Sequence, residues 1–302
     1  MLFKYTKYSR AIDILKTGKV RFTQPSDFND PFELRPEFQL LSQEDIAALP
    51  PVVDADGNEI PGSHILTTEV MQRIMAPVVS YIERKSPPAP NTLGLSYLID
   101  NNAIGRDYYD QNFGIFSLTE THDNLLMWAH YADYHKGVTL GFDEQHPFFS
   151  GPEIAPNTPR LNRVEYNSKR PVISLATKNT PQVFLRKSPE WSYEREWRVV
   201  RPLSEASEVV PREGLAPIYI FDVPVAAIKI VITGAMMAAD EYQNICSYCA
   251  SSEATKHISL HHMQLSKEEY TLDTFPPYPA ISEEQRQRLL AGKALSAKPF
   301  TI

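Results

Sequence analysis

The sequence predicts an α+β protein with a mixed or split antiparallel β core and flanking helices. Short apolar and aromatic segments of strand length recur along the chain, whereas few segments carry apolar residues at helical spacing. The hydrophobic fraction is 42% and the charged fraction 22%, which is typical of a globular protein. The chain is therefore expected to bury a large core.

The N-terminal segment predicts a compact strand, helix, strand unit. Residues 2–6 are short, apolar and aromatic, which favours a strand. Ser9 can cap a helix, and Gly18 can end it before a strand over residues 20–23. Residues 24–33 are rich in Asp, Asn and Pro, which indicates a structured loop.

Residues 41–105 differ in character from the rest of the chain. Proline-rich stretches flank a segment with apolar residues at helical spacing, over residues 67–85. We interpret this region as a variable helical insertion in a single α+β domain over residues 1–275. Residues 276–302 are expected to form a helical tail capped by Ser282.

The remaining regular elements follow from the same patterns. A second strand, helix, strand unit is predicted over residues 113–119, 124–134 and 138–142. Further strands are expected at residues 163–166, 196–201, 218–222, 228–233 and 257–265, and a further helix at residues 239–250.

Charge and targeting signals narrow the function classes. The formal net charge of −7 argues against nonspecific binding to nucleic acid, because no global positive field attracts phosphates. No signal peptide or membrane-spanning run is present, so no membrane partner is expected. The two cysteines are too few for a disulfide framework. Together these features predict a cytoplasmic protein.

One predicted helix face is aromatic with polar tips. Asn124, Trp128, Tyr131 and His135 recur at spacings of four, three and four residues, which brings them to one side of a helix. Their rings can stack on a ligand while their polar atoms form hydrogen bonds. The alternative interpretation is an aromatic stripe that faces the core.

A second candidate lies in a segment where tryptophans alternate with charged residues. If Glu196 begins a strand, Glu196 and Arg198 point to the same face, and Glu194 lies just before them. They could form a binding or catalytic site. The alternative is a cross-strand ion pair on a solvated face.

A third candidate is the loop that contains Asn29, Asp30 and Glu33. Pro31 makes this loop rigid, and its short polar side chains either stabilise a turn or accept hydrogen bonds from a ligand. On its own, the pattern favours the turn.

Several familiar sites are not predicted. Cys246, Cys249, His257 and His261 superficially match a zinc pattern, but two histidines four residues apart on a strand stand about 13 Å apart. No metal site is therefore expected. The sequence also lacks the GxSxG, P-loop and GxGxxG motifs that hydrolases, P-loop proteins and Rossmann enzymes need.

Three stretches resemble a known family. FKYTKYSRAIDILKTGKVRFTQPSDFNDPFE, LLMWAHYADYHKGVTLGFD and WSYEREWRVV are similar to the bacterial family catalogued as domain of unknown function 2971. The likeness runs from residue 1 to about 270, without residues 41–105. The family label implies no activity.

The order of elements also resembles ADP-ribosyltransferase folds. The shared features are a polar first strand, a strand ending at Ser117, a helix with Tyr131 and a glutamate at the start of a later strand. In those enzymes a split β core holds NAD. The resemblance therefore implies NAD as the substrate.

The same resemblance implies roles for individual residues. Tyr131 would stack on nicotinamide, and Glu194 or Glu196 would stabilise the positive charge that develops on the ribose. The first strand has Lys4 and Tyr5 near the position where those enzymes have His or Arg, and Lys4 could bind a phosphate. At this position the sequence departs from the ADP-ribosyltransferase pattern.

Three functions are considered. The first is an NAD-consuming transferase or glycohydrolase, acting as a toxin or phage-defence effector. The second is a nuclease that uses Asp30, Glu33, Glu194 and Glu196 to bind Mg²⁺. The third is a noncatalytic ligand- or protein-binding module. Transferase chemistry requires Tyr131 and a glutamate from the 194–196 segment to face one cleft.

Overall fold

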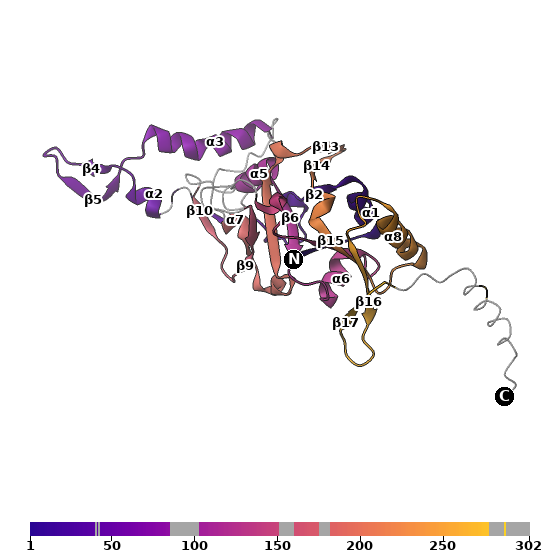
Figure 1. The fold of residues 1–302 in the computed structure, drawn as a ribbon. Coiled ribbons are helices and arrows are strands. Elements are labelled where there is room, and N and C mark those ends of the chain that lie inside the picture. Colours follow the sequence, from indigo (N-terminus) through magenta and orange to yellow (C-terminus); the bar gives the residue numbers. More distant parts are fainter. Residues whose placement is uncertain are drawn as a thin grey trace.

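An eight-stranded sheet forms the centre of the molecule (Figure 1). The computed structural model describes residues 1–39, 41, 43–84, 103–150, 160–174, 182–277 and 287. Neighbouring strands of this sheet are antiparallel, except that β15 and β16 are parallel. In spatial order the strands are β17 (Leu272–Phe275), β16 (Ser259–Leu265), β15 (Ile228–Thr233), β7 (Val138–Phe142), β1 (Leu2–Thr6), β6 (Phe113–Thr119), β12 (Glu196–Pro202) and β8 (Leu161–Arg163).

The other described strands form small sheets. Thr23, the residue after β2 (Lys19–Phe22), forms an isolated bridge with Ile115 of the large sheet. The small sheets are β13 (Glu208–Arg212), β14 (Leu215–Asp222) and β2 (Lys19–Phe22); β10 (Val172–Ser174) with β3 (Glu37–Gln39); β11 (Arg186–Lys187) with β9 (Glu165–Tyr166); and β4 (Pro51–Val53) with β5 (Glu59–His64).

The described helices are short, and none of them combines the length and apolar character that crossing a bilayer requires. The α-helices are α1 (Tyr8–Thr17), α2 (Gln43–Ala47), α3 (Thr68–Arg84), α5 (Ala103–Asn112), α6 (Leu125–Tyr131), α7 (Gln182–Leu185) and α8 (Ala239–Ser251). The 3₁₀ turns are η1 (Pro25–Asp27), η2 (Pro147–Ser150), η3 (Pro189–Glu194), η4 (Leu203–Glu205) and η5 (Val225–Ala227). The predicted mixed α and β composition is confirmed, with a mixed and mainly antiparallel sheet.

The large sheet is nearly divided between β1 and β6. These two strands share a single register pair, Phe3 with Thr119. In contrast, β1 pairs with β7 along its whole length, and β6 pairs with β12 from Phe113 to Thr119. β1 and β6 therefore diverge beyond Phe3, and the side chains between them are free to line a pocket.

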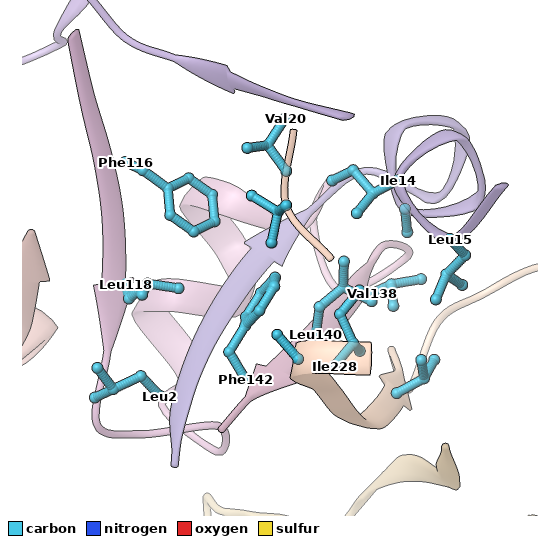
Figure 2. Close-up of a cluster of buried hydrophobic side chains, with 14 of the residues drawn as sticks. Leu2, Ile14, Leu15, Val20, Phe116, Leu118, Val138, Leu140, Phe142 and Ile228 are labelled. Atoms are coloured by element: carbon cyan, nitrogen blue, oxygen red, sulfur yellow. The ribbon is translucent and has the colours of Figure 1, made fainter. Parts of the chain in front are cut away.

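The main core lies where α1 and α8 meet the central strands (Figure 2). β7 is buried at all five positions, as a central strand covered on both faces must be. Phe142 packs edge-to-face against Phe116 of β6, with ring centroids 5.7 Å apart. This packing joins the two parts of the sheet on the side away from α6.

The N-terminal unit forms as predicted, but the helix begins earlier than expected. Lys7, not Ser9, is the N-cap residue of α1, because the Ala11 N–H already donates to the Lys7 carbonyl. Tyr8 packs against the main core, which draws it into the first turn. Gly18 ends the helix in the left-handed conformation with φ 66°, as its position predicted.

The prediction of a helix to residue 134 is wrong, since α6 ends at Tyr131. Asp133, Tyr134 and His135 all have positive φ, so the chain turns sharply before β7. Gly234 makes this turn possible, because a Cβ atom there would lie 2.1 Å from the His135 carbonyl oxygen. His135 therefore does not lie on the helix face predicted for it.

Residues 41–105 contain more than the predicted helix. α3 is present, and its Ile74 and Val78 are buried, as their helical spacing predicted. The β4–β5 hairpin was not predicted, and Figure 1 shows it with α3 projecting beyond the large sheet. α5 begins within the predicted insertion and continues to Asn112. The predicted helix capped by Ser282 lies outside the described residues.

Asn124 caps α6 and offers a direct test of local stability. Its side chain accepts hydrogen bonds from the Leu126 and Met127 N–H groups, 2.9 and 3.2 Å away. We expect Asn124→Ala to lower the free energy of unfolding by about 1 kcal/mol, because both donors lose their acceptor. Urea denaturation measures the loss. Asn124→Asp is the control, since it keeps the acceptor; a loss as large as that of Asn124→Ala would contradict the capping role.

Candidate functional site

A pocket of about 390 Å³ lies where β1 and β6 diverge. The two strands, the loop around η1, helix α6 and turn η3 supply its walls. Seven of the predicted site residues line it: Lys4, Tyr5, Asn29, Ser117, Tyr131, Glu194 and Glu196. These residues come from five separate segments, so tertiary structure alone brings them together.

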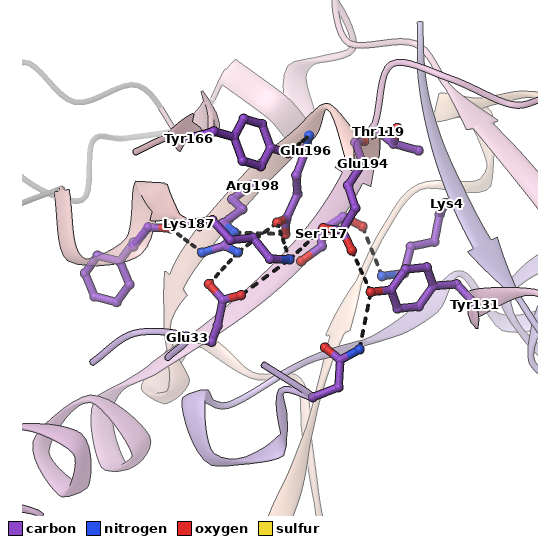
Figure 3. A network of polar contacts seen from close by, with 12 residues as sticks. Lys4, Glu33, Ser117, Thr119, Tyr131, Tyr166, Lys187, Glu194, Glu196 and Arg198 are labelled. Atoms are coloured by element: carbon purple, nitrogen blue, oxygen red, sulfur yellow. Dashed lines mark hydrogen bonds and ion pairs between the residues drawn. The ribbon is translucent and has the colours of Figure 1, made fainter. Parts of the chain in front are cut away.

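Glu194 and Tyr131 meet at the wall of this pocket (Figure 3). The Tyr131 hydroxyl donates to Glu194 Oε1 at 2.6 Å and accepts from the Asn29 amide at 3.4 Å. The Thr119 hydroxyl donates to the Glu194 main-chain carbonyl at 2.5 Å. The carboxylate of Glu194 is therefore fixed in position from both its backbone and its side chain.

Lys187 lines the pocket and joins three buried carboxylates. Its amine lies 2.6 Å from Glu194 Oε2, 3.2 Å from Glu196 Oε2 and 3.4 Å from Glu33 Oε2. Its side chain is only 3% exposed, and the carboxylate side chains are also buried. A buried charge is costly unless it is paired, so this lysine requires its acidic partners.

Arg198 completes the network. Its guanidinium donates to Glu196 at 2.9 and 2.8 Å, to Glu33 at 2.7 Å and to the Phe184 carbonyl at 2.6 Å. The residue is fully buried. Glu196 and Arg198 point to the same face of β12, as strand alternation predicted, but they form a buried network and not a solvated ion pair. We call Glu33, Lys187, Glu194, Glu196 and Arg198 the buried charge network.

Burial and charge oppose each other in setting the pKa values of this network. Burial raises the pKa of Glu196, but Arg198 and Lys187 outweigh it and lower that pKa to about 2. Burial lowers the pKa of Lys187, and attraction to Glu196 and Glu33 outweighs it and raises the pKa. For Glu194, burial dominates and raises its pKa, despite the contact with Lys187. Glu194 thus takes up a proton more readily than Glu196.

The low pKa of Glu196 predicts acid sensitivity. A carboxylate whose pKa is depressed on folding stabilises the protein above its unfolded pKa of about 4.3, and this contribution is lost as the pH falls towards 2. We expect wild-type stability to fall more steeply below pH 4 than that of Glu196→Gln, by up to about 1.4 kcal/mol per pH unit. The contribution of Glu194 to stability changes with pH in the opposite direction, because folding raises the pKa of its carboxyl group.

Urea unfolding of both proteins between pH 2 and 6, in about half-unit steps, measures this difference. Glu190→Gln is the control, because Glu190 is exposed and lies in η3, the turn just before β12. Parallel stability curves for wild type and Glu196→Gln would contradict the prediction.

Five predicted site residues do not line this pocket: Trp128, His135, Arg198, Asp30 and Glu33. Trp128 is fully buried against Tyr5 and donates to the His122 carbonyl at 2.8 Å, which matches the core-facing alternative. His135 stacks on Trp128 with ring centroids 6.5 Å apart. Asp30 and Glu33 line a neighbouring cavity of about 190 Å³.

Two important residues were not among the predicted site residues. Lys187 stood in the segment with many charges, but its sequence position gave no reason to separate it from the neighbouring cations. Phe28 lines the pocket and lies 5.6 Å from the Arg198 guanidinium carbon, measured to the ring centroid. For Lys187, the available signal was a lysine close in sequence to several glutamates. No sequence signal marked Phe28.

Within the described part of the chain, no group of three or more His, Cys, Asp or Glu side chains is arranged to hold a metal ion. The carboxylates of the buried charge network are close together, but Lys187 and Arg198 already form ion pairs with them. Cys246 and Cys249 are both free thiols.

Comparison with known proteins links the central part of this site to a family. Residues 127–199 match the family described as Protein of unknown function (DUF2971). The matched segment includes Tyr131, Lys187, Glu194, Glu196 and Arg198. It is shorter than the likeness expected from the sequence motifs. No match was found among curated proteins or solved structures.

Proposed function

We propose that the protein is an NAD-consuming enzyme of the ADP-ribosyltransferase type, with NAD bound in the pocket between β1 and β6. The observation that carries this proposal is the meeting of Tyr131 and Glu194 in one pocket, joined by a 2.6 Å hydrogen bond. The near division of the sheet between β1 and β6 also supports it, because ADP-ribosyltransferases hold the dinucleotide in a split β core.

Glu194 is the proposed catalytic carboxylate. Cleavage of the bond to nicotinamide leaves positive charge on the ribose, and a preorganised carboxylate in a buried pocket stabilises that charge. Tyr131 fixes one oxygen of Glu194, and its ring is available as a platform for the departing nicotinamide. Lys4 lines the same pocket, and the protonated form of its amine is available to a phosphate of the substrate.

Glu196 takes a positioning role in this proposal. Both oxygens of Glu196 accept from buried cations, whereas Glu194 Oε1 accepts from the neutral Tyr131 hydroxyl at the pocket wall. Glu196 therefore holds Lys187 against Glu194, and Glu194 is the carboxylate proposed to act on the substrate. This assignment separates the two glutamates that the sequence left equivalent.

The metal-dependent nuclease is the less favoured alternative. Mg²⁺ needs free carboxylate oxygens, and here Lys187 and Arg198 occupy oxygens of Glu33, Glu194 and Glu196.

A noncatalytic ligand-binding module is the second candidate. The buried charge network makes the pocket wall rigid, and a rigid wall serves ligand binding with or without a catalysed reaction.

The test is nicotinamide release by the purified protein incubated with NAD, with and without cell extract as a source of acceptors. Isothermal titration with NAD measures binding in parallel. We expect binding and nicotinamide release. A folded protein that neither binds NAD nor releases nicotinamide would overturn the proposal.

A further inference from the structure

Lys4 is half-buried and differs from the two buried cations beside the pocket, Lys187 and Arg198. Lys187 and Arg198 each contact at least two carboxylates within 4.0 Å. Among the described residues, no carboxylate oxygen lies within 4.0 Å of the Lys4 amine. It donates instead to the main-chain carbonyl of Ser117, 3.0 Å away across the gap between β1 and β6. This amine therefore has a hydrogen-bond partner but no ion-pair partner.

The surroundings of the amine favour its neutral form. Burial lowers its pKa to about 8. The Phe116 ring, with its centre 5.2 Å from the amine, attracts the charged form and so acts against this shift. Glu196 and Glu194 act at longer range to raise this pKa, and Arg21 acts to lower it. At pH 7.4 about one-fifth of such an amine is neutral, compared with about one-thousandth of an ordinary lysine.

The hydrogen bond of the Lys4 amine and its position in the pocket wall together suit a nucleophile. A neutral amine that donates one N–H to the Ser117 carbonyl keeps its lone pair free. Lys4 lines the pocket, and Figure 3 shows its amine directed towards Ser117. An amine that is held, largely desolvated and reachable from a pocket is the arrangement that imine-forming lysines require.

We propose that Lys4 is a nucleophilic lysine that forms an imine with small aldehydes in the pocket, including sugars in their open-chain form. The lone pair of Nζ attacks the carbonyl carbon, and the carbonyl electron pair moves to oxygen. The first amine proton passes to this oxygen and gives a hydroxyl group, and the second amine proton then converts that hydroxyl into water, which leaves as the C=N bond forms. Amine and aldehyde thus give imine and water, and no oxidant is needed. The inference does not depend on NAD turnover.

The probe is pyridoxal 5′-phosphate with sodium cyanoborohydride, which delivers hydride to the imine carbon and makes the adduct permanent. Wild-type protein is labelled at limiting aldehyde between pH 6.5 and 9. Peptide mass spectrometry then compares Lys4 with Lys7, an exposed lysine in the same segment. Fragment ions separate Lys4 from the α-amine of Met1.

We expect Lys4 to be labelled at least about tenfold faster than Lys7, with a rate that rises through pH 8. Protein unfolded in urea should lose this preference, because the preference comes from the folded environment. Lys4→Arg, checked for folding by circular dichroism, should lose the fast label. Equal labelling of Lys4 and Lys7 in the folded wild type would overturn the proposal.

Discussion

Replacing Arg198 by methionine is expected to lower the free energy of unfolding by about 3–5 kcal/mol, because it leaves buried carboxylates without their main partner. Glu33 and Glu196 would keep only Lys187, which Glu194 already shares. Methionine fills much of the arginine volume, so loss of charge and hydrogen bonds dominates the effect. Chemical denaturation followed by circular dichroism measures it.

Arg163→Met is the matched control for this variant. Arg163 lies on β8, the strand next to β12, but its side chain is 63% exposed, and it pairs with Glu120 at the surface. We expect a loss below about 1 kcal/mol. Arg198→Lys should fall between the two, because it keeps the charge but loses the planar set of donors. Stability of Arg198→Met equal to wild type would show that the network contributes little to folding.

Replacing Glu194 by glutamine is expected to reduce nicotinamide release by about 10²–10³-fold. Glutamine keeps the size of the side chain and an acceptor for the Tyr131 hydroxyl, so the pocket should persist. What disappears is the negative charge that would stabilise the ribose cation. A loss in kcat with little change in KM is the expected form, because the charge acts mainly on the transition state.

Glu190→Gln controls for the loss of a negative charge in turn η3, because Glu190 is exposed and lies in the same turn. It should keep wild-type turnover. Urea unfolding of Glu194→Gln establishes that the variant is folded. If Glu194→Gln turned over NAD at the wild-type rate, Glu194 would not be the catalytic carboxylate.

Local signals predicted much of the fold. β1, β6, β7 and β12 lie where the short apolar segments predicted them, because β propensity and burial act together in central strands. Gly18 was predictable as a helix end because few other residues adopt its positive φ. The β4–β5 hairpin was missed, and so were β3, β10 and β11, because strands of two or three residues carry too little periodicity to detect.

The candidate site was only partly predictable. Tyr131, Glu194 and Glu196 stood out by residue type and spacing, but the sequence could not separate the roles of the two glutamates. That separation depends on Lys187 and Arg198, and on Glu33 from a distant part of the chain. His135 was misplaced because the left-handed turn after α6 requires close packing against Gly234, which no local pattern reveals.

The sequence by itself determined the α+β class, the main strands and the two segments that carry Tyr131, Glu194 and Glu196. These properties depend on side-chain periodicity and on conformational preferences within a few residues. Only the tertiary structure decided that β1 and β6 diverge, that Tyr131 meets Glu194 in the pocket, and that Lys4 has no ion-pair partner among the described residues. Burial and charge pairing join segments far apart in the chain, so neither can be derived from local sequence alone.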